Sequence, residues 1–174
     1  MRRIADFYEQ PLQWTQPSML KGSYELRAGD DLVATLNFRS MWGTLTTAES
    51  MDGCWTFKRV GFWQNKATVR LCSSDQDLAV FTNNTWTQGG TLDFAAGGTY
   101  KATTNFWMTN YEFQSESGEP LVRFKYGGFF RLSAEVEILP AAVTLEHLPV
   151  LVLFGWYLAI NLYNDSGAAA AAVS

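Results

Sequence analysis

The residue types that most often carry out enzyme chemistry are scarce and scattered in this sequence. The single histidine, His147, stands beside Glu146 but has no cluster of metal ligands or nucleophiles around it. Asp75 and Asp77 alternate in the segment SSDQD, yet they lack the glycine and the ligand order of a calcium loop. Catalysis needs a nucleophile with a base, or paired carboxylates in a pocket. We therefore expect a non-enzymatic protein with no catalytic residues, no metal site and no cofactor.

A set of basic side chains offers a candidate binding site for an anionic lipid headgroup. Arg123 and Lys125 are two residues apart and share one face of a strand. A neighbouring hairpin could bring Arg70 or Arg131 alongside them, and the group would then hold a headgroup through charge-assisted hydrogen bonds. The plainer alternative, which ordinary mixed surface charge favours, is a solvated outer face on which these cations pair with Asp and Glu.

A second candidate is the aromatic segment VGFWQNK, in which Phe62 and Trp63 precede Lys66. Aromatic side chains at a loop tip can enter a membrane interface because one end of the side chain is apolar and the other polar. The sequence therefore predicts an interface loop at these three residues. The alternative, which is the commoner fate of large aromatic side chains, is packing in the core or against a hairpin.

Overall charge argues against a general affinity for nucleic acid. The 174-residue chain carries 13 Lys and Arg against 17 Asp and Glu, a net charge of −4. It therefore has no positive field to hold a phosphate backbone nonspecifically. The N-terminal stretch MRRIADFYEQPLQW lacks the apolar run of a secretory signal. We expect a cytoplasmic protein, peripheral to the membrane where it meets anionic lipid, with a protein partner or a homodimer as the other possible association.

Two cysteines, Cys54 and Cys72, are too few for a disulfide scaffold or an all-cysteine zinc site. The two could form a single bridge. We expect reduced, buried thiols instead, because free cysteine behaves as a small buried hydrophobic residue.

The elements that must position these residues are short strands. From Ser18 to about Ile138, apolar and polar residues alternate, with turn signals about every ten residues. Alternation buries one face and leaves the other in water, as in an antiparallel meander. We count about ten to twelve strands, more than an open sheet usually carries without curling or closing. The sequence therefore predicts a mainly β protein: a closed antiparallel barrel of about twelve strands.

We interpret residues 1–174 as one domain with four parts. Residues 1–19 form an irregular lead-in because Pro11 and Pro17 disfavour a helix there. Residues 20–139 supply the barrel strands. A helix follows at residues 144–163, and a flexible tail at residues 164–174.

The C-terminal apolar segment differs from the strands. It lacks two-residue alternation and is apolar on almost every side, which favours a helix capped by Thr144. A helix that is apolar all round must be buried all round, and one helix among about a dozen strands is most simply placed inside the barrel. Gly155 would let a strand or a large ring approach its backbone closely.

This layout resembles the tubby-like superfamily, which includes tubby C-terminal domains, phospholipid scramblases and the plant LURP-one-related proteins. The resemblance covers about residues 20–163. It rests on SYELRAGDDLVATLNF as the opening hairpin, EPLVRFKY as a late one, and FFRLSAEVEIL followed by LPVLVLFGWYLAINLY. In that group the last helix threads the barrel, and members associate with membranes. The resemblance implies a non-enzymatic barrel that binds lipid headgroups or a protein partner.

Two alternative functions stay open at this point. One is a lipocalin-type carrier that holds a small apolar ligand inside the barrel. A helix within the barrel argues against it by filling that space. The other is a tail-anchored membrane protein with residues 148–163 in the bilayer. The segment is shorter than the roughly 20 residues a span needs, and Asn161 interrupts it.

Overall fold

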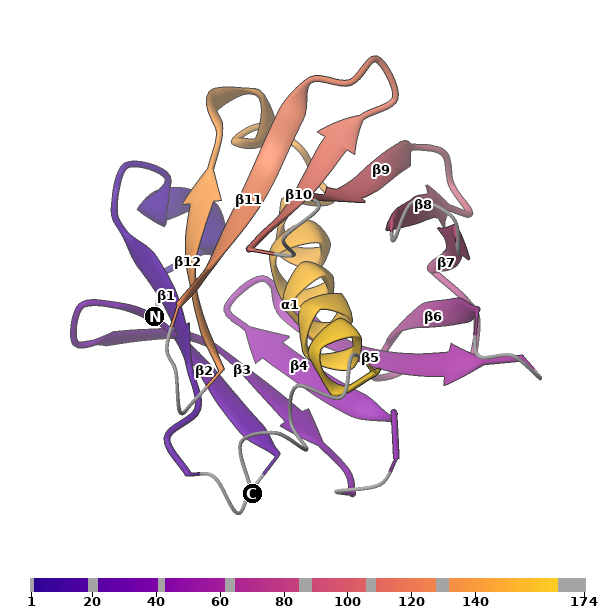
Figure 1. The fold of residues 1–174 in the computed structure, drawn as a ribbon, viewed down its shortest axis with the longest axis horizontal. Helices are drawn as coiled ribbons and strands as arrows, with labels where there is room; N and C mark the ends of the chain where they lie inside the picture. The colour runs from indigo at the N-terminus through magenta and orange to yellow at the C-terminus, as the bar shows by residue number, and fades with distance from the viewer. Residues whose placement is uncertain are drawn as a thin grey trace.

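The chain forms a closed antiparallel barrel with one helix inside it, as predicted (Figure 1). The computed structural model describes residues 2–18, 22–40, 43–61, 65–84, 89–105, 109–127 and 132–165. Each strand pairs with the next along the chain, and β1 pairs with β12 to close the ring. The twelve strands are β1 (Leu12–Thr15), β2 (Ser23–Ala28), β3 (Asp31–Phe38), β4 (Thr46–Ser50), β5 (Gly53–Val60), β6 (Lys66–Leu71), β7 (Ala79–Asn84), β8 (Gly89–Phe94), β9 (Thr99–Thr104), β10 (Asn110–Ser115), β11 (Pro120–Gly127) and β12 (Ser133–Ile138).

The N-terminal strand β1 corrects the prediction of an irregular lead-in at residues 1–19. Trp14 lies opposite Leu26 of β2 on one side and Ala134 of β12 on the other. Pro11 and Pro17 flank this strand rather than interrupt it, so neither removes a hydrogen bond from the ladder. Without β1, the strands β2 and β12 would each present an open edge, which closure removes.

A short 3-10 helix, η1 (Ile4–Phe7), precedes β1 and is also part of the structure. Ile4 and Phe7 are buried. The backbone N–H of Ile4 donates to the carboxylate of Asp52, in the turn between β4 and β5, at 2.9 Å. This contact holds η1 at the end of the barrel where the central helix begins. There η1 also contacts that helix.

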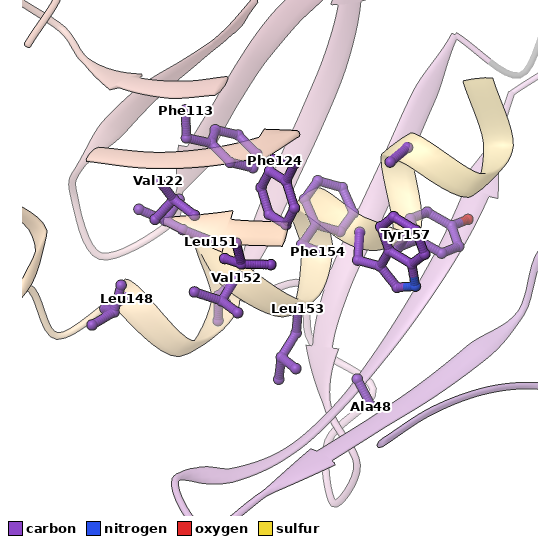
Figure 2. Close-up of a cluster of buried hydrophobic side chains, with 14 of the residues drawn as sticks. Ala48, Phe113, Val122, Phe124, Leu148, Leu151, Val152, Leu153, Phe154 and Tyr157 are labelled. Carbon is purple, nitrogen blue, oxygen red and sulfur yellow. The ribbon is translucent and has the colours of Figure 1, made fainter. Parts of the chain in front are cut away.

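The central helix, α1 (Leu148–Asp165), is buried along most of its length. Figure 2 shows its aliphatic and aromatic side chains among those of the wall, including Phe113, Val122 and Phe124. Rings from several strands pack against it; for example, Trp14 stacks on Trp156 with centroids 5.8 Å apart. None of the helices in the described part of the chain is long and apolar enough to cross a membrane.

The predicted bounds of the helix, 144–163, are wrong at both ends. A second 3-10 helix, η2 (Pro140–Ala142), and a turn carry the chain from β12 to Leu148. Thr144 is exposed in that turn, and the backbone carbonyl of His147 accepts the first helical hydrogen bond, from Leu151, at 3.0 Å. The helix continues to Asp165, so the predicted tail loses its first two residues to α1. The rest of that tail lies outside the described residues.

Gly155 is the point of closest approach between helix and wall, as the sequence suggested. A Cβ atom there would lie 2.4 Å from Cζ of Phe124 and 3.1 Å from Cε2 of Phe113. No Cβ atom tolerates the shorter distance without a shift of its neighbour. The glycine therefore makes room for the Phe124 ring.

The two cysteines correct a second prediction. Cys54 and Cys72 form a disulfide, with Cα atoms 5.4 Å apart, rather than a pair of buried thiols. Trp55 of β5 pairs with Leu71 of β6, and this register puts the next two residues, the cysteines, opposite each other. Cys54 is half-buried and Cys72 is exposed.

His147 anchors the start of α1 through its ring. The imidazole stacks on Phe94 with centroids 3.6 Å apart, and its Nδ1 lies 2.9 Å from the Tyr100 hydroxyl. Burial lowers the pKa of His147, and the neighbouring Glu146 carboxylate opposes that shift. Burial also raises the pKa of Tyr100, so this hydroxyl keeps its proton and can donate to the neutral ring.

We predict that Gly155→Ala destabilises the protein. In an exposed helix this change is stabilising by about 1 kcal/mol, but here the new methyl group collides with Phe124, and overpacking typically costs about 1–3 kcal/mol. Chemical denaturation should show a lower free energy of unfolding. Adding Phe124→Leu should recover part of the loss, because the two sites touch. A stabilised Gly155→Ala variant would contradict the packing.

We also predict a pH dependence of stability that His147 causes. The folded pKa lies below the usual value of about 6.5, so the unfolded chain binds the proton more readily. The contribution of the neutral ring is complete above pH 6.5 and is lost as the pH falls through the folded pKa. Denaturation of wild type and His147→Gln between pH 8 and 5 should show their difference shrinking on acidification. A constant difference would rule out this role.

Candidate functional site

The predicted headgroup site on the outer wall is a network of ion pairs. The Arg123 guanidinium lies 2.7 Å from the Glu112 carboxylate and 3.0 Å from that of Glu137. The hydrogen bond to Glu112, together with the charges of both carboxylates, raises the pKa of Arg123. Lys125 lies 3.5 Å from Glu137 and 4.0 Å from Glu135. These cations are already matched by carboxylates, as in the plainer alternative.

The other two members of that predicted site do not join it. Arg70 is on β6 and pairs with Asp77 at 2.6 Å, and β7, β8, β9 and β10 separate β6 from β11 around the barrel. Arg131 lies outside the described residues. The structure thus brings Arg123 and Lys125 together and keeps Arg70 apart from them.

The predicted interface loop lies between β5 and β6. Phe62 and Trp63 are outside the described residues. Lys66, the first residue of β6, is exposed and lines a pocket at the end of the barrel where α1 ends. This pocket, which we call the rim pocket, has a volume of about 60 Å³. It has room for several water molecules or one small polar group. Its lining consists of Arg59, Asn65, Lys66, Ala67, Phe81, Asn83, Tyr111, Leu158, Asn161, Leu162 and Asp165.

Strand alternation explains why polar residues line this pocket. Trp55, Phe57 and Arg59 are alternate residues of β5, so all three take inward positions. Trp55 and Phe57 are buried deep in the barrel, whereas Arg59 is near the end of the strand and reaches the rim. On β7 the inward positions end with Asn83, which follows the buried Phe81. The last inward position on each of these strands is therefore polar.

The helix supplies the opposite wall of the rim pocket. Leu158, Asn161 and Leu162 lie on its last turns, and Asp165 ends it. Asn161 is buried, and its side-chain N–H donates to the backbone carbonyl of Tyr157 at 2.7 Å. This hydrogen bond holds the Asn161 side-chain amide in place at the lining of the pocket.

An ion pair joins the two walls. Arg59 contacts both carboxylate oxygens of Asp165, at 3.1 and 2.8 Å. The Arg59 side chain is 17% exposed and that of Asp165 is 54% exposed. Among the described residues that line the pocket, Asp165 is the one acid, against two cations and three side-chain amides. The lining is therefore rich in hydrogen-bond donors.

Tyr111 also lines the rim pocket. Its burial raises the pKa of the phenol well above the usual value of 10, and the neighbouring Tyr126 raises it further. The hydroxyl therefore stays protonated at physiological pH.

Over the described ranges, no group of three or more His, Cys, Asp or Glu side chains could hold a metal ion.

Most residues of the rim pocket were not predicted from the sequence. Arg59, Asn83, Asn161 and Asp165 were not among the predicted site residues. A usable signal was present for the first two: each is a polar residue at an inward position of a strand whose preceding inward residues are apolar. Nothing in the sequence indicated that Arg59 meets Asp165, because 106 residues separate them.

Comparison with known proteins supports the architecture. The X-ray structure of a protein from Arabidopsis thaliana superposes with a TM-score of 0.57, covering 87% of this chain and 92% of that one, at 9% sequence identity. The likeness is one of fold. Neither a protein-family model nor a curated protein sequence matches the chain.

Proposed function

We propose that this chain is a non-enzymatic, tubby-like barrel that binds an anionic lipid headgroup at the rim pocket. The observation that carries the proposal is the donor-rich lining of that pocket, at the end of a barrel whose interior the helix fills. Charge-assisted hydrogen bonds from lysine, arginine and amide groups suit a phosphate. Lys66 is exposed, so an incoming phosphate group should contact it first.

The sequence of the neighbouring connections supports a membrane at this end. Antiparallel pairing sends the connections after β3, β5, β7 and β9 from the same end of the barrel. In the sequence these connections contain Trp42, Trp63, Trp86 and Trp107, all outside the described residues. Tryptophan is enriched at membrane–water interfaces. We propose that this end, where Lys66 is exposed, faces the bilayer.

The two alternative functions fit the geometry less well. A carrier of an apolar ligand needs a cavity of about 300–1,000 Å³, whereas α1 occupies the barrel interior and the rim pocket measures about 60 Å³. A tail anchor needs residues 148–163 in lipid, but those side chains pack against the barrel wall.

We predict that the protein floats with vesicles containing phosphatidic acid and not with vesicles of phosphatidylcholine alone. Lys66→Gln should weaken this binding about fivefold, since one lysine near an anionic surface contributes about 1 kcal/mol. The matched control is Lys101→Gln, which removes an exposed lysine of β9 away from the pocket. Equal flotation with both vesicle types would contradict the proposal. Displacement by millimolar inorganic phosphate would instead indicate a soluble phosphate ligand.

The disulfide bears on where the protein works. Disulfides persist in oxidising compartments and are rare in the cytoplasm, so the bond between Cys54 and Cys72 favours an oxidising compartment over the predicted cytoplasmic location. Membrane surfaces border both kinds of compartment.

We predict that rapid acid quenching of cells, followed by alkylation and mass spectrometry, finds both cysteines unalkylated until a reductant is added. Purified protein prepared without reductant is the control for bond formation. Cysteines that are alkylated in quenched cells but bonded in the purified control would favour the cytoplasmic location instead.

A further inference from the structure

We propose that Asp165 competes with the ligand for the rim pocket. Its carboxylate binds the Arg59 guanidinium, where the anionic group of a ligand would otherwise bind. This inference rests on the proposed function, because it concerns how the same pocket is regulated. What it adds to that function is that Asp165, a residue of this chain, weakens ligand binding.

Arg59 is the fixed half of the pair. It takes an inward position on β5, where it lies opposite Ala67 of β6 in the strand ladder. Its side chain is largely withdrawn from water, at 17% exposure. The fork of N–H groups on a guanidinium fits a carboxylate or a phosphate equally well through two parallel bonds.

Asp165 is the half that can leave. It is the last described residue of α1, and its side chain is 54% exposed. A half-exposed ion pair gains little, because water screens it. The Asp165 carboxylate can therefore exchange Arg59 for water at little cost.

The exchange has a simple consequence. A phosphate that enters the rim pocket meets Lys66 at the exposed edge and must displace the carboxylate to reach Arg59. No covalent bond changes; one anion replaces another. Because the coupling is reciprocal, ligand binding should also free the end of α1, and holding Asp165 on Arg59 should weaken binding.

The test compares Asp165→Asn with wild type in binding to vesicles containing phosphatidic acid. Removing the competitor should tighten binding about threefold to fivefold, the range that a half-exposed ion pair supports. Asp77→Asn is the matched control, because it removes one negative charge and one Asp–Arg ion pair away from the pocket. It should leave binding close to that of wild type. Both variants should unfold at the wild-type denaturant concentration.

A third variant shows whether Arg59 carries the effect. In the Asp165→Asn background, Arg59→Gln should abolish the gain. Equal affinity of Asp165→Asn and Asp77→Asn would overturn the competitor while leaving the proposed function intact, provided that wild type binds. Failure of wild type and of Asp165→Asn to bind any vesicle would overturn both. Binding by Asp165→Asn alone would support both and indicate near-complete inhibition by Asp165.

Discussion

The burial of a helix that is apolar on every side is the constraint on which the rest of this structure depends. Except for Pro149 and Leu158, the side chains of α1 from Leu148 to Ile160 are almost fully withdrawn from water, and each large one contributes about 1.5–3 kcal/mol when buried. One partner surface could not cover all faces of such a helix. A closed wall can, and that is why every strand, including the short β1, is needed.

Because α1 fills the interior of the barrel, polar side chains that could bind a ligand lie at the two ends of the barrel and on its outer face. At the end where α1 begins, η1 packs against the helix, and His147 stacks on Phe94. At the other end, inward positions of the wall change from apolar to polar, and Arg59, Asn83 and Asn161 line the rim pocket. The small volume of this pocket follows from the same packing, since the helix reaches nearly to the rim.

Charge on the outer face has a different character from charge at the rim. Arg123 and Lys125 lie among Glu112, Glu135 and Glu137 on neighbouring strands, where the strand register sets cation beside anion. Such exposed pairs add little stability, but they leave no net positive field for a ligand. At the rim the balance is reversed, because in the described part of the pocket lining donors outnumber the one carboxylate, that of Asp165.

Local pattern determined much of this protein, and long-range closure decided the rest. Alternation in β11 and β12 indicated which side chains face inward, and the uniform hydrophobicity of residues 148–163 indicated a buried helix, because both periodicities are properties of neighbouring residues. Gly155 was identifiable for the same reason. The role of β1, the disulfide partner of Cys54 and the pairing of Arg59 with Asp165 were not. Each depends on strand register or on the path of α1 through the barrel, which set residues far apart in the chain side by side.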